Sequence, residues 1–510
     1  MDRAGRLLER HERLCFQRAF PRSAAELRRA VRELAGFERL VAPVRGELEN
    51  SGIAGTVYRY PFNYRMARWF AERYGGAVEI DWEAYKRHEW DEVAALLSLC
   101  TAIAEYDGLD DDDVPSWDWV AFARAGRRGT ALGWLLDAIG RAGFEPELAR
   151  HLFESMNLPL AWDLAGCPDS VTHARLPVRR VFYHREILRE RPKDFAAAVR
   201  RPVGPLTLLR PRAAERIIDA ARAALSQRER EFHVIVHGNP DEVYRFDAGR
   251  GLEIYVIGLV RPLRLTLEAD YGALLVKNGV PIGYGYAALL FDRADIAINI
   301  FPTYRAGESP FVFVRFAQVF HHHFRQQKLV MRRYQLGWQN PEGLEAGSFW
   351  FYYKLGFRSV DARVRAVAEA EAARLARRAG ARSEEAMLKR LARSDMVLCL
   401  DGTGVERFRD VEVKKVGLAV TRLIERRFGG DRVSALRTIT SRLVRTLGVA
   451  RVPGRMGPVA ALIPDLPRWS MPERRRLAAL MLAKEGRREG PYVLAMLRHP
   501  RFQRFLQRFQ

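Results

Sequence analysis

The stretch YGALLVKNGVPIGYGYAALLF, residues 271–291, places Asn278-Gly279 between two apolar runs. Asn and Gly readily adopt the left-handed backbone conformations of a two-residue hairpin turn, so this pattern predicts two antiparallel strands. Further strands are expected at FHVIVHG (232–238), LEIYVIGLV (252–260), IAINIF (296–301) and LVMRRYQLG (329–337). Helical spacing appears at about 212–230 and 309–326. Antiparallel strands interleaved with helices indicate a mixed α/β domain of the α+β type.

Helical regions flank this domain on both sides. At 510 residues the chain is too long for one hydrophobic core. Residues 1–205 show mostly helical spacing and end in a proline-rich stretch, and residues 363–510 are helical again. In the second region, Gly429-Gly430 interrupts the pattern, and Ser470 with Glu473 forms a capping box. We therefore expect three domains, at 1–205, 206–362 and 363–510.

The composition excludes several classes of protein. No stretch reaches the eighteen or so uninterrupted apolar residues that a membrane helix needs. The N-terminal twenty residues lack the apolar core of a signal peptide, and their acidic residues argue against a transit peptide. The four cysteines form no close pair, so neither a CxxC motif nor a disulfide framework is expected. These features predict a cytoplasmic protein without a membrane span, and they do not indicate its oligomeric state.

The net charge of +22 raises nucleic acid as a partner. Arginine is spread along the chain, however, with no long basic run and no zinc-finger or RRM signature. These features weigh against nucleic-acid binding. The net positive charge is the only feature that favours it, so it stays an open alternative.

Two short runs suggest metal binding, and neither has suitable geometry. Three consecutive helical residues such as His321, His322 and His323 fan over about 200°, so they cannot converge on one ion. The run Asp110–Asp113 lacks the spaced ligands and glycine of a calcium loop, and we expect an exposed loop there. No metal site is expected.

The densest aromatic stretch, SFWFYYKLGF, occupies residues 348–357. Asn340 is a suitable N-cap, Pro341 suits the first turn, and Gly356 suits the left-handed position after a helix. We therefore expect one helix over 341–355. Its end, FWFYYKLGF, resembles the signature that closes the fourth helix of the GNAT superfamily of acyl-CoA-dependent N-acyltransferases.

The resemblance covers residues 210–362 and also includes the order of the expected elements. It implies a central GNAT-like mixed sheet in which the strands at 296–301 and 329–336 diverge. The space between them would hold the pantetheine arm of acetyl-CoA or another acyl-CoA, next to Asn299 and Ile300. The following loop would bind the pyrophosphate, through Arg305, Ala306, Gly307 and Ser309. Asn340 matches a family asparagine that contacts the donor's arm, although helix capping explains it equally well.

The resemblance also implies the catalytic residues. Tyr352 matches the tyrosine that protonates the departing thiolate, while Tyr353 faces elsewhere because adjacent helical residues are about 100° apart. The alternative for Tyr352 is an aromatic core residue. Glu308 is our candidate general base; Asn299, Asp295, Tyr334 and a bound water are further candidates.

The loop RAGESP (305–310) departs from the family's Arg/Gln-x-x-Gly-x-Gly/Ala pattern. Glu308 replaces the first motif glycine, and Pro310 the second. A carboxylate there would repel a diphosphate by on the order of 1 kcal/mol or more.

These features predict an N-acyltransferase that moves an acyl group from a thioester donor, acyl-CoA in the first instance, to a small-molecule or protein amine. Two alternatives remain open. The domain could be a GNAT-fold binding or scaffolding protein that has lost catalysis, or the donor could be an acyl-carrier protein or a charged tRNA.

Overall fold

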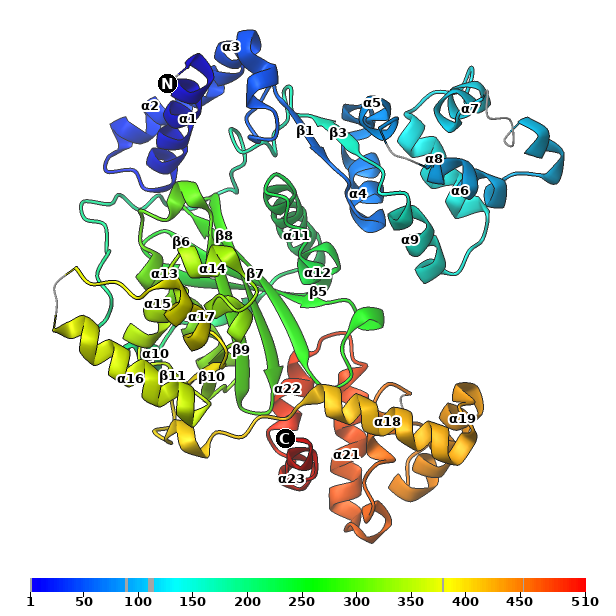
Figure 1. The fold of residues 1–510 in the computed structure, drawn as a ribbon, viewed down its shortest axis with the longest axis vertical. Coiled ribbons are helices and arrows are strands. Elements are labelled where there is room, and N and C mark those ends of the chain that lie inside the picture. Colours follow the sequence, from blue (N-terminus) through cyan, green and yellow to red (C-terminus); the bar gives the residue numbers. More distant parts are fainter. Residues whose placement is uncertain (1, 88–89, 109–113, 378–379, 453) are drawn as a thin grey trace. The chain divides into compact units, whose positions relative to one another are not determined.

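The computed structural model describes residues 2–87, 90–108, 114–377, 380–452 and 454–510 (Figure 1). The aspartate run at 110–113 is outside the described residues. The chain divides into two compact units. Unit 1 comprises residues 1–185, 216–237 and 277–281, and unit 2 comprises residues 186–215, 238–276 and 282–510.

Unit 1 is mainly helical and also contains a small sheet. Among its described residues, three strands pair in the order β1-β3-β2. Trp162 of β3 packs against Phe70 and Tyr74 of α4 at the centre of its core. The elements are α1 (Arg3–Ala19), α2 (Ala24–Ala35), α3 (Phe37–Val41), β1 (Val57–Tyr60), α4 (Tyr64–Tyr74), β2 (Val78–Ile80), α5 (Trp82–Tyr85), α6 (Glu92–Cys100), α7 (Ser116–Ala123), α8 (Ala131–Arg141), α9 (Pro146–Ser155), β3 (Leu160–Asp163), residues 216–226 of α11 (Pro211–Ser226) and α12 (His233–Val236).

Unit 2 is built on a large mixed sheet. Within the described ranges, nine strands pair in the order β11-β12-β10-β9-β8-β7-β6-β5-β4. Strands β9 and β10 run parallel, whereas β8–β9, β10–β12 and β11–β12 are antiparallel. The strands are β4 (Leu206–Leu208), β5 (Gly238–Gly249), β6 (Leu252–Leu259), β7 (Ala269–Lys277), β8 (Val280–Leu290), β9 (Arg293–Ile300), β10 (Lys328–Met331), β11 (Arg358–Ser359) and β12 (Met396–Cys399). A mixed sheet flanked by helices confirms the expected α/β class.

Helices precede, interrupt and follow this sheet along the chain. One close approach positions α13: a Cβ at Gly285 of β8 would lie 2.6 Å from the Phe316 ring, so the glycine lets the helix pack directly on the sheet. The helices are α10 (Phe195–Arg200), α13 (Ser309–His323), α14 (Pro341–Glu345), α15 (Ser348–Lys354), α16 (Ala362–Ala376), α17 (Glu385–Leu391), α18 (Val413–Phe428), α19 (Arg432–Leu447), α20 (Gly457–Ala460), α21 (Met471–Lys484), α22 (Gly490–Met496) and α23 (Pro500–Leu506).

Several local expectations are confirmed. Asn278 (φ 48°) and Gly279 (φ 85°) form the two-residue turn between β7 and β8. Helix α18 ends at Gly429 (φ 56°), and Ser470 with Glu473 forms the capping box of α21. No helix in the described ranges combines the length and apolar character needed to cross a membrane.

Three expectations are wrong. FHVIVHG contains the short helix α12 rather than a strand. Its three consecutive buried apolar residues are compatible with either structure, so the sequence pattern could not distinguish them. The strand expected over 329–337 ends at Met331 and continues as a 3-10 turn, Arg333–Leu336. The helix expected over 341–355 is split into α14 and α15 at Gly347, whose φ of 62° is left-handed. Strand β12, which follows residue 362, pairs between β10 and β11 in the same sheet.

Candidate functional site

Strands β9 and β10 pair over a short distance, and β10 then ends at Met331 while β9 continues. Their register runs from Arg293 opposite Lys328 to Asp295 opposite Val330. Strand β9 continues for five more residues, 296–300, which we call the β9 edge. These residues pair with β8 on the other side, and the last four of them are half-buried, whereas the paired part of β9 is buried. Expected site residues Asn299 and Ile300 lie at the end of this edge.

The loop after β9 carries most of the expected phosphate-binding residues. Arg305 donates from Nε to the carbonyl of Ile300 at 3.0 Å, and its NH2 group lies 3.2 Å from Glu342 of α14. Both side chains of that ion pair are half exposed, so it holds Arg305 weakly. Ala306 is exposed, Gly307 is buried, and Ser309 donates its hydroxyl to the Arg305 carbonyl at 3.2 Å. The loop leads directly into α13, whose N-terminus favours anions.

Glu308 is buried and ion-paired. Its Oε1 atom accepts hydrogen bonds from Arg250 Nε at 3.0 Å and from the main-chain N–H of Leu188 at 3.3 Å. Arg250 lies in the turn between β5 and β6 and also donates to the carbonyl of Glu186 at 2.8 Å. Oε1 is thus directed at Arg250, which neutralises the carboxylate's charge. Arg250 could not be identified from the sequence, because 58 residues separate it from Glu308.

The adjacent tyrosines of α15 face different surroundings. Tyr352 is buried against Phe313 of α13 and Phe357, with ring centroids 5.7 Å from each. Among the described residues, its hydroxyl has no hydrogen-bond partner, and burial raises the pKa of Tyr352 above its ordinary value. Tyr353 instead packs under the Arg358 guanidinium, 4.3 Å from the ring centroid. Tyr352 is therefore a neutral phenol packed among aromatic rings.

Asn340 caps α14. Its side-chain oxygen accepts from the N–H of Gly343 at 3.3 Å, and its amide nitrogen donates to the carbonyl of Tyr334 at 3.0 Å. The capping explanation is therefore confirmed, and both ends of the amide are already used. Contact with a donor molecule would require one of these bonds to change.

The other candidate base, Asp295, belongs to an ionic network. Its carboxylate is buried and pairs with Arg293 and Arg332. Arg332 also contacts Asp395 and Asp410, each at 2.8 Å. This network connects β9 and β10 with the segments on either side of β12. It lies where the pairing of β9 with β10 ends.

Two of the three consecutive histidines bind separate main-chain groups. His321 Nδ1 lies 2.8 Å from the carbonyl of Gln326, and His322 Nε2 lies 3.1 Å from that of Val199. In the part of the chain that the structure describes, no group of three His, Cys, Asp or Glu side chains is arranged to hold a metal ion.

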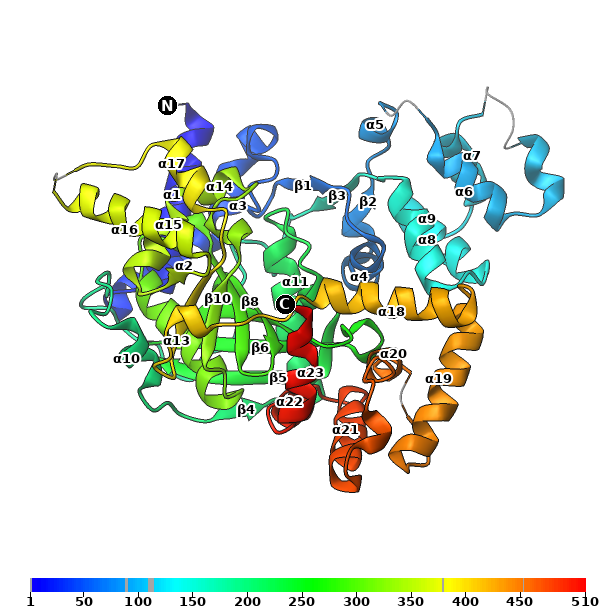
Figure 2. The same ribbon diagram turned by 60° about the horizontal axis from the view of Figure 1, so that its bottom comes forward.

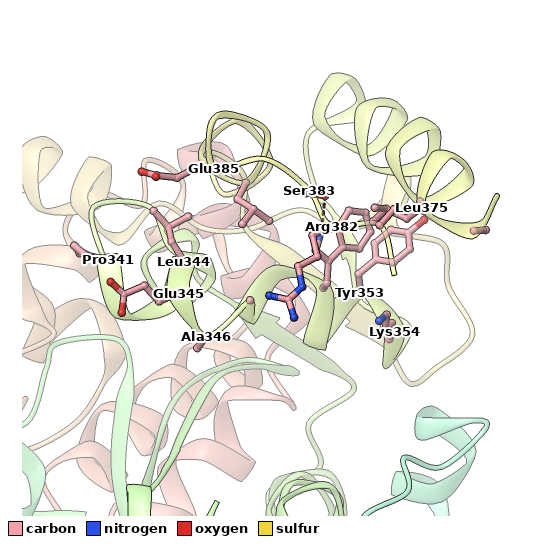
Figure 3. Close-up of a pocket in the computed structure, with 16 residues that line it drawn as sticks. Pro341, Leu344, Glu345, Ala346, Tyr353, Lys354, Leu375, Arg382, Ser383 and Glu385 are labelled. Atoms are coloured by element: carbon pink, nitrogen blue, oxygen red, sulfur yellow. Dashed lines mark hydrogen bonds between the residues drawn. The ribbon is translucent and has the colours of Figure 1, made fainter. Parts of the chain in front are cut away.

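A cavity of about 930 Å³ lies on the Tyr353 face of α15, between α14, α16 and α17 (Figure 3). Figure 3 shows Tyr353 and Leu375 on one side of it and Leu344 with Glu385 on the other. The Trp350 indole donates to Ser383 at 3.0 Å and so links α15 to the segment before α17. This largely apolar cavity includes neither Tyr352 nor Asn299.

Comparisons with protein-family models, with curated proteins and with solved structures give no match to this chain.

Proposed function

We propose that unit 2 carries an N-acyltransferase that transfers an acyl group from acyl-CoA to an amine. The observation that carries the proposal is the short parallel pairing of β9 and β10, which ends at Asp295 and leaves the β9 edge half-buried. An extended pantetheine arm could hydrogen-bond to the main chain of that edge as an added strand does. The GNAT resemblance implies that these two strands diverge beyond their paired residues.

The loop and α13 support binding of the donor's pyrophosphate. Arg305 is held by one exposed ion pair and one hydrogen bond, so it can turn toward a phosphate at small cost. The repulsion expected from Glu308 is reduced, because Arg250 neutralises the buried carboxylate. The long helix α13 begins beside this loop and contributes the positive end of its dipole.

The proposed chemistry needs few groups. The amine attacks the thioester carbonyl, the carbon–sulfur bond breaks, and the departing thiolate takes a proton from the Tyr352 hydroxyl. The amine's own proton leaves to water, and water then restores the proton of Tyr352. Because Glu308 Oε1 is directed at Arg250, we assign Glu308 the role of holding the loop rather than that of a base.

Calorimetry with coenzyme A, followed by thiol release from acetyl-CoA with a set of primary amines, tests the proposal. We expect CoA binding that Arg305→Ala weakens, together with amine-dependent release of thiol. Absence of both would overturn the proposal. Binding without turnover would indicate the scaffolding alternative, and turnover only with an acylated carrier protein or a charged tRNA would identify a different donor.

A further inference from the structure

A second cavity in unit 2 shares none of its lining residues with the site proposed above. It lies between the β4–β5 edge of the sheet and the C-terminal helices α21 and α22. Figure 2 shows these two helices next to each other. Its volume is about 850 Å³, which is within the usual range for sites that bind small molecules. The inference below does not depend on the acyltransferase proposal.

The polar part of this cavity is strongly positive. Arg476 of α21, Arg488 before α22 and Arg498 after it line the cavity, and no Asp or Glu is among its described lining residues. In the described part of the chain, none of these three arginines forms an ion pair with a carboxylate. The contrast with their neighbours is clear: Arg487 pairs with Asp241 at 2.6 Å, and Arg501 pairs with Asp465 at 2.7 Å.

The remaining walls are mainly apolar. Leu206 of β4, Phe324 at the end of α13, Leu480 of α21 and Leu494 of α22 contribute the larger apolar side chains. Ala495 contributes a small one that leaves space. A ligand that fits both parts of the cavity has an anionic group and an apolar group in one molecule.

The cavity walls are held together by buried polar contacts. Glu242 of β5 is fully buried and accepts from the main-chain N–H groups of Glu489 and Gly490, both at 2.7 Å. The hydroxyl of Tyr271 donates to the same carboxylate at 3.0 Å. Lys484 of α21 pairs with Glu489 in the interior. These bonds attach the start of α22 to the sheet, so the cavity is formed before a ligand enters.

Two histidines also line the cavity. The Nε2 atom of His323 is enclosed by protein atoms and has no hydrogen-bond partner among the described residues, so it is not open to a ligand. The other histidine, His499, differs, because both of its nitrogens bond to the main chain, at Phe502 and Glu473.

We propose that this cavity binds a phosphate monoester that carries an apolar chain. A phosphate dianion suits unpaired guanidinium groups, which offer planar pairs of N–H donors to its oxygens. Its apolar chain packs against the half-buried side chains of Leu206 and Leu494. A soluble phosphate ester and a phospholipid headgroup share this chemistry.

Isothermal titration calorimetry of the full chain with octyl phosphate tests the proposal. We expect a dissociation constant of about 100 μM or lower at physiological salt, with inorganic phosphate and octanol each binding about tenfold or more weakly. The double variant Arg476→Ala/Arg498→Ala should lose about tenfold or more in affinity. The matched control is Arg475→Ala, an exposed arginine on the same helix that does not line the cavity.

Ala495→Phe provides a second test, because it fills the cavity and keeps every arginine; it should abolish binding of octyl phosphate. The proposal is overturned if the unmodified protein does not bind octyl phosphate, if Ala495→Phe binds it normally, or if Arg475→Ala weakens binding as much as the double variant. Vesicles containing phosphatidic acid should compete with octyl phosphate if the natural ligand is a lipid headgroup. If the vesicles do not displace octyl phosphate, the natural ligand is a soluble phosphate ester.

Discussion

Arg250 donates to Glu308 across 58 residues of sequence, with 3.0 Å between Nε and Oε1. The pair joins the turn between β5 and β6 to the loop that begins α13. The Glu308 side chain is fully buried, and that of Arg250 is 26% exposed. The geometry of the proposed phosphate-binding loop therefore depends on a residue on another part of the sheet.

We expect Arg250→Ala to lower the free energy of unfolding by about 3 kcal/mol, because it leaves a buried carboxylate without its charge partner. Urea unfolding followed by tryptophan fluorescence would measure this loss. Adding Glu308→Gln should recover part of it, since the uncompensated charge is then absent. The control is Glu342→Gln, which breaks the exposed pair with Arg305 and should cost less than about 0.5 kcal/mol. Equal effects of Arg250→Ala and Glu342→Gln would contradict this reading of the pair.

Tyr352→Phe tests the proposed proton donor. The change retains the ring that packs against Phe313 and Phe357, and it removes only a hydroxyl without a partner among the described residues. Stability should therefore change little, whereas turnover should fall by about 10²- to 10⁴-fold. Steady-state kinetics of thiol release would show the difference. Tyr353→Phe is the matched control on the other face of α15, and a greater loss in this control than in Tyr352→Phe would rule out Tyr352 as the acid.

Asp270 should make the stability of unit 2 dependent on pH. Its buried carboxyl accepts from the Tyr286 hydroxyl at 3.0 Å, and burial raises its pKa to about 6. The folded state then binds this proton more tightly than the unfolded state, in which the carboxyl has its ordinary pKa of 3.8. This contribution to stability is complete below about pH 4 and is lost as the pH rises through about 6, by about 3 kcal/mol in all.

Asp270→Asn should remove that dependence. Relative to the unmodified protein, the variant should become more stable as the pH is raised from 4 to 7, because the amide stays neutral and can still accept from Tyr286. Urea unfolding at several pH values would measure the difference. A difference between the two proteins that stays constant over this range would show that Asp270 does not titrate in this way.

Gly283→Ala tests the position of the β9 edge. A Cβ at Gly283 would lie 2.4 Å from the Asn299 carbonyl oxygen and 3.0 Å from Ile300 Cα, so the main chain must move. We expect a loss of about 3 kcal/mol in unfolding free energy and weaker CoA binding. Gly417→Ala in α18 is the control: a Cβ there meets nothing within 4 Å, so the change should be neutral or stabilising by up to about 1 kcal/mol. A stable Gly283→Ala protein with unchanged CoA affinity would show that the edge tolerates the movement.

Features that depend on a few neighbouring residues could be predicted from the sequence. The turn at Asn278-Gly279 and the capping box of Ser470 follow from the conformations and hydrogen bonds that these residues favour locally. The Asn340 cap of α14 follows from the same kind of local preference. The break at Gly347 was missed, because a glycine inside a helical pattern marks a break only when tertiary packing favours one there.

By itself, the sequence determined the mixed α/β class, the central hairpin and the ends of several helices, since each is a local property of the chain. Tertiary structure alone decided that β12 pairs between β10 and β11, that Arg250 neutralises Glu308, and that Tyr352 faces Phe313 while Tyr353 faces a cavity. It also decided which arginines near the C-terminus have carboxylate partners. These features depend on which distant segments meet, and local propensity does not specify those contacts.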